Sequence, residues 1–317
     1  FWIKGAESCL IITSDMENAE RVARALYDFK KKYRVMDIVD YRREDLTDRM
    51  LAVSTVFLYD VPVDARTHII DFCYQNLKNI YFNPQIADIL ERNSKQVIID
   101  DISFYSSQFH LITYEQRIIK RLMDIFISTS ALIITSPVLL VSAICIKKND
   151  GGSILFRQRR ATANGRVFLI YKFRTMKENV DNYSVTGGDD RVTAVGKFLR
   201  RYRIDELPQF YNILKGDMSL VGPRPEMLEN VEDYTKEMPE FRYRLRMKAG
   251  LTGNAQIIGK YNTSSRDKLM LDLMYIKNYS ILKDIQLLFH TILVLFNADD
   301  STAAFSIDES QTEQKQK

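Results

Sequence analysis

Short apolar runs punctuate the first 112 residues of the chain. A short run of such residues has the form of a buried strand, and helical stretches separate the runs. Strands that alternate with helices favour a parallel sheet, so residues 1–112 are expected to form a Rossmann-like α/β domain. The expected strands lie at Cys9–Thr13, Val35–Val39, Val53–Leu58 and Val97–Ile99.

The turn after the first of these runs lacks the features of a nucleotide site. Ser14 or Asp15 can cap a helix predicted from about Glu17 to Lys31, where apolar residues recur at helical spacing. The turn has no glycine and two acids, whereas a pyrophosphate requires close backbone approach and positive charge. We therefore expect this domain to be structural or regulatory, with dinucleotide binding as the less favoured alternative.

The most apolar stretch runs from Ile125 to Ile146 and holds no charged residue. Its length is sufficient for a helix to cross a bilayer. Ser136-Pro137 lies at its middle, where proline removes a helix hydrogen bond, and both flanks are basic. Residues 113–150 are therefore expected to form a re-entrant membrane helix hairpin that bends at the proline and returns. A buried core helix and a straight crossing are the alternatives.

The remaining sequence, residues 151–298, looks globular and strongly basic. Its apolar-rich segment at 280–297 predicts a helix that packs in the core or, alternatively, lies at a membrane interface. Residues 299–317 are polar and predict a disordered tail. The three cysteines and three histidines are scattered, so disulfide, zinc and histidine-based catalytic sites are disfavoured.

Basic residues gather between Arg157 and Lys177, where no acidic residue occurs. Such a density beside an apolar segment indicates an anionic partner, whether lipid headgroups, a nucleotide diphosphate or nucleic acid. Alternating residues from Phe168 to Arg174 predict a strand with Lys172 and Arg174 on one face. A solvated basic surface without catalysis is the plainer alternative.

Asp205 and Glu206 are adjacent carboxylates that follow a run of arginines ending at Arg203. These arginines are expected to lower both carboxyl pKa values and keep both side chains ionised. An ionised aspartate can attack phosphorus, and a neighbouring glutamate can hold a divalent cation such as Mg²⁺. Read alone, such a pair is more often a surface ion-pair cluster.

Two later segments also suggest phosphate chemistry. Arg224 lies between Pro223 and Pro225, whose rings restrict the backbone and suit the arginine to a phosphate contact. Residues 242–256 add basic side chains and a glycine-containing turn that could close over a nucleotide. A structural turn and a basic surface loop are the respective alternatives.

Taken in order, these segments resemble the bacterial sugar transferases, the monotopic polyprenyl-phosphate hexose-1-phosphate transferases. The resemblance covers about residues 117–298. Larger members of that family carry transmembrane helices and a Rossmann-like domain before the catalytic domain, so membrane helices are expected upstream of Phe1. The matching motifs are Lys120-Arg121-x-x-Asp124, Ser136-Pro137, Tyr171-Lys172-Phe173-Arg174-Thr175-Met176, Asp205-Glu206-Leu207-Pro208-Gln209 and Gly216–Pro225.

The resemblance implies an α/β fold, in which a Rossmann-like domain precedes a re-entrant, Ser-Pro-kinked membrane helix and a mostly helical catalytic domain at 151–298. It also implies a reaction that moves a sugar-1-phosphate from a UDP-sugar to undecaprenyl phosphate and releases UMP, the first membrane step of polysaccharide or glycoconjugate assembly. Asp205 is the implied nucleophile and forms a covalent phosphosugar intermediate. Glu206, with Asp205, is the implied holder of Mg²⁺.

Substrate contacts are expected from the motifs and the basic runs. The expected residues are Lys120, Arg121, Arg160, Lys172, Arg174, Arg203, Arg224, Lys248 and Gln256. The chain departs from the family pattern after Arg160, where the usual Pro-Gly turn is missing, and at 248–256, where the usual proline and tryptophan are missing. Both departures leave the two carboxylates untouched.

The expected location is the bacterial cytoplasmic (inner) membrane, with the catalytic domain on the cytoplasmic face. A homodimer through the N-terminal domain is considered, and no nucleic acid partner is expected.

No residue separates glucose, galactose or N-acetylated sugars on physical grounds; glucose or galactose is favoured because the larger architecture is often associated with them. The competing hypothesis is a membrane-associated basic binding or regulatory protein without catalysis.

Overall fold

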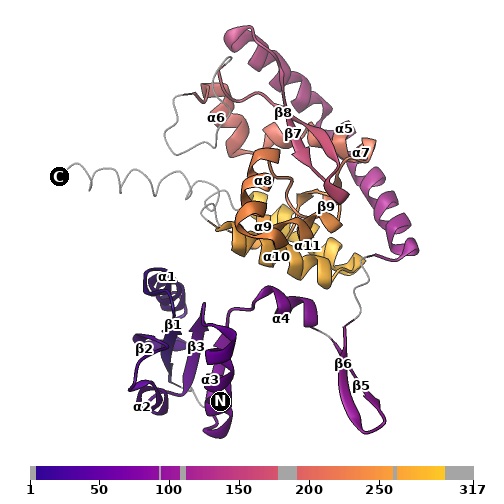
Figure 1. Cartoon of the computed structure of the whole chain (residues 1–317). Helices are drawn as coiled ribbons and strands as arrows, with labels where there is room; N and C mark the ends of the chain where they lie inside the picture. Colours follow the sequence, from indigo (N-terminus) through magenta and orange to yellow (C-terminus); the bar gives the residue numbers. More distant parts are fainter. Residues whose placement is uncertain (1–4, 93, 108–111, 178–190, 260–262, 297–317) are drawn as a thin grey trace, which may run out of the picture. The chain divides into compact units, whose positions relative to one another are not determined.

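A computed structural model describes residues 5–92, 94–107, 112–177, 191–259 and 263–296 (Figure 1). The chain divides into two compact units, one ending at Gln85 and the other beginning at Ile86. The sequence-based boundary at residue 112 differs from this division. The difference arises in part because helix α4 (Ile86–Glu91) packs Ile89 into the core of the second unit. The predicted tail at 299–317 lies outside the described residues.

The first unit is the expected parallel α/β sheet, with four strands in the order β2-β1-β3-β4. Helices alternate with the strands, and Leu10, Ile12 and Val56 lie in the buried core. The order is that of doubly wound sheets. The elements are β1 (Glu7–Thr13), α1 (Met16–Tyr27), β2 (Tyr33–Asp40), α2 (Leu46–Leu51), β3 (Thr55–Tyr59), α3 (Val63–Gln75) and β4 (Asn79–Phe82).

Helix α1 begins where the sequence predicts, and Asp15 is the residue that caps it. The Asp15 carboxylate accepts a hydrogen bond from the Asn18 backbone N–H at 3.0 Å, which satisfies a donor that the first helical turn leaves open. Ser14, the other candidate, donates instead to the Asp60 carbonyl oxygen.

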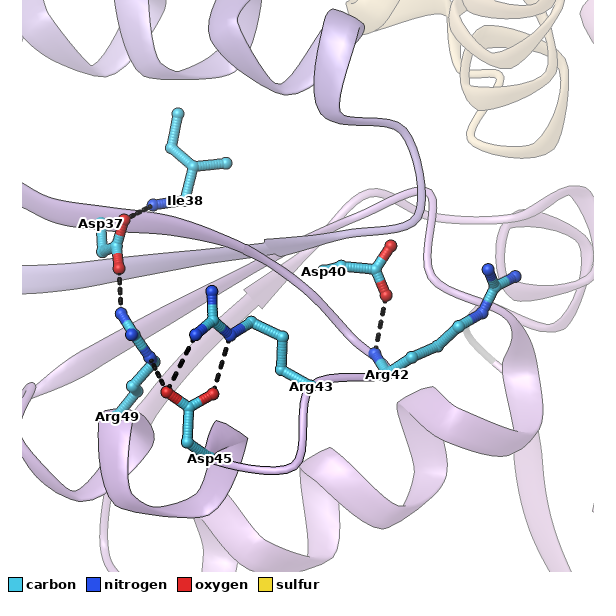
Figure 2. A network of polar contacts seen from close by, with 7 residues as sticks. All are labelled: Asp37, Ile38, Asp40, Arg42, Arg43, Asp45 and Arg49. Carbon is cyan, nitrogen blue, oxygen red and sulfur yellow. Dashed lines mark hydrogen bonds and ion pairs between the residues drawn. The ribbon is translucent and has the colours of Figure 1, made fainter.

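An ion-pair network fastens β2 to the start of α2 (Figure 2). Arg49 forms ion pairs with Asp37 and Asp45. Asp45 also pairs with Arg43, whose Nε lies 2.7 Å from Asp45 Oδ1. Hydrogen bonds from Arg43 and Arg49 lower the pKa of Asp45 to about 2. Exposed pairs of this kind contribute about 0–1 kcal/mol each, so the network orients two elements and adds little stability.

The prediction that 97–99 joins the parallel sheet is wrong. These residues lie in β5 (Lys95–Ile99), which pairs antiparallel with β6 (Ile102–Ser106) in a hairpin of the second unit. The connecting residues Asp100 and Asp101 both have positive φ, at 46° and 64°. A type I′ hairpin turn requires positive φ at both central residues, and aspartate tolerates it, so this dipeptide permits the antiparallel turn.

Helix α5 (Tyr114–Asp150) contains the apolar stretch as one helix, where the sequence predicts a hairpin. Pro137 lies inside it and cannot donate to the carbonyl oxygen of Ile133. The hydroxyl of Ser136 donates to that same oxygen at 2.8 Å. The Ser-Pro pair therefore removes one helix hydrogen bond and supplies its replacement, which lets the helix continue.

Both ends of α5 are held by the second unit. Near its start, Asp124 accepts hydrogen bonds from Ser219 Oγ and Leu220 N at 3.0 and 2.9 Å. Near its end, Ile146 packs with Phe173 and Leu199. Between Tyr114 and Asn149 the helix is long and apolar enough to cross a membrane, and only 11% of its apolar window is buried. The exposed apolar surface indicates membrane association.

The rest of the second unit is mostly helical, with two small sheets. Its core includes Phe241, Leu269 and Leu287. The last helix buries Leu287 but exposes Leu282 and Phe289, so its two sides face different surroundings. The elements are β7 (Leu155–Ala161), η1 (Ala163–Gly165), β8 (Val167–Phe173), α6 (Ala194–Arg201), η2 (Ile204–Glu206), α7 (Gln209–Lys215), β9 (Ser219–Val221), α8 (Leu228–Glu237), η3 (Pro239–Arg246), β10 (Gly250–Thr252), α9 (Asn254–Ile258), α10 (Ser265–Lys277) and α11 (Ile281–Phe296).

Candidate active site

The two carboxylates lie on η2, a single helical turn between α6 and α7. Arg203 precedes the turn with φ 55°, a left-handed conformation that non-glycine residues seldom adopt. Strained backbone of this kind clusters at functional sites, where the surrounding structure holds it in place. From this turn, Glu206 contacts Lys172 of strand β8 and Arg224 of the segment that follows β9.

Glu206 is the centre of a cluster of cations. Its Oε1 lies 2.9 Å from Arg224 Nη2, 3.4 Å from Lys172 Nζ and 4.0 Å from Arg203 Nη1. Burial alone would raise the pKa of Glu206, but the attraction of Arg224 and Lys172 outweighs burial and holds the pKa well below its usual value. Glu206 is therefore ionised at neutral pH, as the sequence predicts.

Asp205 behaves differently, and the expectation that its pKa is lowered is wrong. Burial is the main cause of a rise in the pKa of Asp205 to about 6, and the adjacent Glu206 charge adds to it. Lys172, Arg200 and Arg203 oppose the rise without cancelling it. The carboxylate is thus more basic than an ordinary aspartate, yet ionised in most molecules at neutral pH.

Strand β8 carries Lys172 and is fastened to the helix that follows the carboxylates. The Asn212 side chain, fully buried on α7, accepts from Tyr171 N at 2.9 Å and donates to the Leu169 carbonyl oxygen at 2.7 Å. A buried amide that satisfies two backbone groups fixes the spacing between a strand and a helix. The predicted strand is confirmed, although it ends at Phe173, one residue before Arg174.

The segment that carries Arg224 rests on a crossing of two glycines. A β-carbon on Gly250 would lie 2.1 Å from the Gly222 nitrogen, so this approach leaves no room for a side chain. The close approach permits a hydrogen bond from Gly250 N to the Pro223 carbonyl oxygen at 2.9 Å. Arg160 Nη1 holds the far side of the segment by donating to the Pro225 carbonyl oxygen at 3.1 Å.

Lys120 and Arg121, which the sequence assigns to substrate binding, make their contacts with protein groups. Lys120 pairs with Asp284 at 2.5 Å. Arg121 donates from Nη1 to the Ile213 carbonyl oxygen and from Nη2 to the Leu214 carbonyl oxygen, at 2.7 and 2.6 Å. None of these contacts involves Asp205 or Glu206. Both residues anchor α5.

For three further predicted residues, the contacts described here do not include Glu206. Arg174 is buried and donates to the Ser153 carbonyl oxygen at 2.6 Å. Lys248 is partly desolvated, which with repulsion from nearby Arg121 lowers its pKa. Gln256 lies on α9, and both of its buried amide atoms are without a hydrogen-bond partner among the described residues.

Two arginines of the predicted basic runs also shape the site, although neither is among the nine residues expected to contact substrate. Arg200 helps to oppose the pKa rise of Asp205 and donates to Thr175 Oγ1 at 2.8 Å. Arg244 is 2% exposed and pairs with Asp272 at 2.7 Å. The basic run at 242–248 contains Arg244, but the run alone does not distinguish the one buried arginine. Asp272 is a clearer signal, because it lies at helical spacing, three residues after the apolar Leu269. A carboxylate buried there needs a cationic partner, and Arg244 is that partner.

The two adjacent carboxylates could supply oxygen donors to a divalent cation. The described residues contain no group of three or more histidine, cysteine and acidic side chains that could hold a metal alone. Mg²⁺, however, is often held by one or two carboxylates together with substrate phosphates. Asp205 and Glu206 fit that donor set, since the ion pairs of Glu206 described above all fall on Oε1.

Comparison with known proteins gives consistent matches over the second unit. Residues 115–298 match the family model described as "Bacterial sugar transferase". The chain is 43% identical over 180 residues to a UDP-N-acetylgalactosamine-undecaprenyl-phosphate N-acetylgalactosaminephosphotransferase of Aeromonas hydrophila, covering 55% of this chain and 43% of that protein. It is 42% identical over 183 residues to a UDP-glucose:undecaprenyl-phosphate glucose-1-phosphate transferase of Klebsiella pneumoniae, covering 55% and 39%.

A third relative extends into the first unit. The undecaprenyl-phosphate galactose phosphotransferase of Salmonella typhimurium is 30% identical over 322 aligned positions, which cover 87% of this chain and 66% of that protein. The chain thus matches less than half of the first two relatives and about two thirds of the third. The family model alone covers more than half of the chain, and the protein belongs to the bacterial sugar transferase family.

Proposed function

We propose that the protein transfers a sugar-1-phosphate from a UDP-sugar to undecaprenyl phosphate and releases UMP, as the first membrane step of polysaccharide or glycoconjugate assembly. The observation that carries the proposal is the pair of adjacent carboxylates beside Lys172 and Arg224, in which the pKa of Asp205 is raised and that of Glu206 is lowered. The three relatives share undecaprenyl phosphate in their names and differ in the sugar. Glucose or galactose is the donor sugar that we expect here.

In the first step, Asp205 attacks the phosphorus that carries the sugar. A bond forms between this phosphorus and a carboxylate oxygen. The bond from phosphorus to the bridging oxygen of the diphosphate breaks, and UMP leaves with that oxygen and its electron pair. The attack requires an ionised Asp205, and a pKa of about 6 leaves about nine tenths of the molecules ionised at neutral pH.

In the second step, an oxygen of undecaprenyl phosphate attacks the same phosphorus. The bond to Asp205 breaks, and its electron pair returns to the carboxylate. The product is the sugar linked through a diphosphate to undecaprenol, and the carboxylate is ready for another cycle. The two half-reactions predict ping-pong kinetics.

The cations around Glu206 suit two reactants that are both anionic. Lys172 and Arg224 can neutralise the charge that builds on the transferred phosphoryl group, and Arg160 adds charge beside the same segment. When bound, Mg²⁺ would offset the charge of the diphosphate. We assign its protein ligands to Asp205 and Glu206.

The apolar helix supports a location at the cytoplasmic membrane. Both of its ends are held by the same unit, which favours a helix that embeds its exposed side in one leaflet over a helix that crosses. The basic flanks favour the cytoplasmic face. A lipid acceptor could then reach the carboxylates without leaving the membrane.

The test is a nucleotide-release assay with the full chain in detergent or nanodiscs. UMP release from UDP-glucose or UDP-galactose is expected to require both undecaprenyl phosphate and Mg²⁺ for multiple turnovers. D205N should abolish turnover with unchanged thermal unfolding. Full activity of D205N would refute the nucleophile assignment. Salt-sensitive oligonucleotide binding without UMP release would favour the competing binding-protein hypothesis.

A further inference from the structure

Arg224 lies on the short segment between β9 and α8. Its side chain contacts Glu206, but the backbone of the segment is held from two other directions by ion pairs that are almost fully buried. We call them the Arg244 pair and the Lys120 pair; they are Arg244–Asp272 and Lys120–Asp284.

The Arg244 pair connects α10 to the backbone of Arg224. Nε and Nη2 of Arg244 lie 2.9 and 2.7 Å from Asp272 Oδ2, and the same Nη2 donates to the Arg224 carbonyl oxygen at 2.8 Å. Nη1 lies 3.7 Å from Glu226 Oε1. One guanidinium therefore contacts the segment on both sides of Pro225.

The Lys120 pair connects the apolar helix α5 to the other end of the segment. Lys120 Nζ lies 2.5 Å from Asp284 Oδ2 and donates to the Val221 carbonyl oxygen at 3.0 Å. Tyr275 donates to Asp284 Oδ1 at 2.7 Å and lies 3.3 Å from the same Val221 oxygen. Asp284 is 0% exposed. The network holds the last residue of β9, after which the segment turns towards Glu206.

Buried ion pairs of this kind are seldom explained by stability. Removing two charges from water carries a penalty that can exceed their attraction, and apolar replacements are often neutral or stabilising. Here the Arg244 pair directs a hydrogen bond to the Arg224 carbonyl oxygen, and the Lys120 pair directs one to the Val221 carbonyl oxygen, where the segment begins. These contacts set the distance between Arg224 and Glu206, and a misplacement of about 1 Å at a reacting centre can reduce a rate by about 10²-fold.

We infer that Arg244 and Lys120, each with its buried carboxylate, are positioning residues that hold Arg224 against Glu206 during the transfer. The inference rests on the proposed function. It also gives α5 a role besides membrane association, because the Lys120 pair couples that helix to the segment that carries Arg224.

A double-mutant cycle on the full chain tests the inference. R244K keeps a cation beside Asp272 but loses the planar fork that also reaches the Arg224 carbonyl oxygen. In the otherwise unchanged chain, R244K is expected to lower kcat for UMP release by on the order of tenfold. In an R224K background the same change should have almost no further effect on kcat, because the arginine that Arg244 positions is already absent.

D217N is the matched control. Asp217 is 5% exposed and pairs with Arg166 and Lys215, but it touches neither pair. D217N and R224K should therefore act independently, so the fold-loss of kcat in the double variant should equal the product of the two single fold-losses. D272N and D284N provide second variants that preserve side-chain shape, and each should show the same lack of additivity with R224K as R244K does.

Two results would overturn the inference. One is full activity of R244K and D284N; the other is a loss of kcat in these variants that multiplies with the loss in R224K, as a purely structural role requires. Thermal unfolding of every variant separates lost folding from lost positioning. The proposed function fails in a different way, since the unchanged chain would then release no UMP at all.

Discussion

Lys172 provides the sharpest test of the electrostatics at Asp205. Its ammonium lies 3.4 Å from Glu206 and is the first of the three cations that oppose the rise in the pKa of Asp205. Replacing it by methionine keeps the length of the side chain and removes the charge. The pKa of Asp205 should then rise further, so the nucleophile should be protonated over a wider range of pH.

The size of the effect follows from the pKa of Asp205, about 6. Because the pKa is raised, the active carboxylate is present above it and is lost as pH falls through it. Loss of an adjacent cation shifts a carboxyl pKa by about 1 to 3 units. Even the smaller shift would move the midpoint to about 7 and reduce the ionised fraction at neutral pH from about nine tenths to about one half.

The assay is the pH dependence of the first UMP burst, measured without undecaprenyl phosphate. Leaving out the acceptor matters because a phosphate monoester itself titrates near pH 6, at about the same value as Asp205. The burst rate of the unchanged chain should fall about tenfold per pH unit below the midpoint. K172M should move the midpoint upward. R166M removes a cation that pairs with Asp217 and not with Glu206, so it should leave the midpoint in place.

Two outcomes would refute this reasoning. A midpoint of about 4 in the unchanged chain would mean that Asp205 titrates like an ordinary aspartate. A midpoint that stays in place in K172M would mean that Lys172 does not act on the nucleophile.

Three other changes test separate parts of the account. R224K should lower kcat/KM by on the order of 10²-fold with little change in thermal unfolding, because lysine cannot replace a guanidinium that contacts Glu206 and, in the proposed reaction, also binds the transferred phosphoryl group; unchanged kinetics would contradict this. S136A should destabilise the folded chain by about 1 kcal/mol in denaturant unfolding, because the carbonyl that proline leaves unpaired loses its replacement donor. G250A should lower both thermal stability and UMP release, because the added methyl group would overlap the Gly222 nitrogen; wild-type stability would show that the crossing can open.

The sequence predicted local structure well where local chemistry determines it. The apolar run at 9–13 and the capping Asp15 identified β1 and the start of α1. The same reasoning failed at 97–99, because an apolar run does not reveal its partner strand. Asp100-Asp101 was only a weak signal, because the dipeptides that favour a two-residue hairpin turn contain glycine.

At the site, sequence motifs identified the carboxylates, and the structure brings Lys172 and Arg224 to them across long separations. The sequence could not show that two adjacent carboxylates have pKa values shifted in opposite directions, because burial and the position of each cation decide the sign. Lys120 shows the same limit. Its partner Asp284 lies far along the chain, so a basic motif beside an apolar helix did not reveal an internal ion pair.

The most direct test of the central claim is intact-protein mass spectrometry after the chain is mixed with a UDP-sugar and Mg²⁺ without any lipid acceptor. The account predicts that the chain gains one sugar-phosphate, that fragmentation places the adduct on Asp205, and that added undecaprenyl phosphate removes it. UMP release and lipid product without such an adduct, or an adduct that persists in D205N, would contradict the claim that Asp205 is the nucleophile.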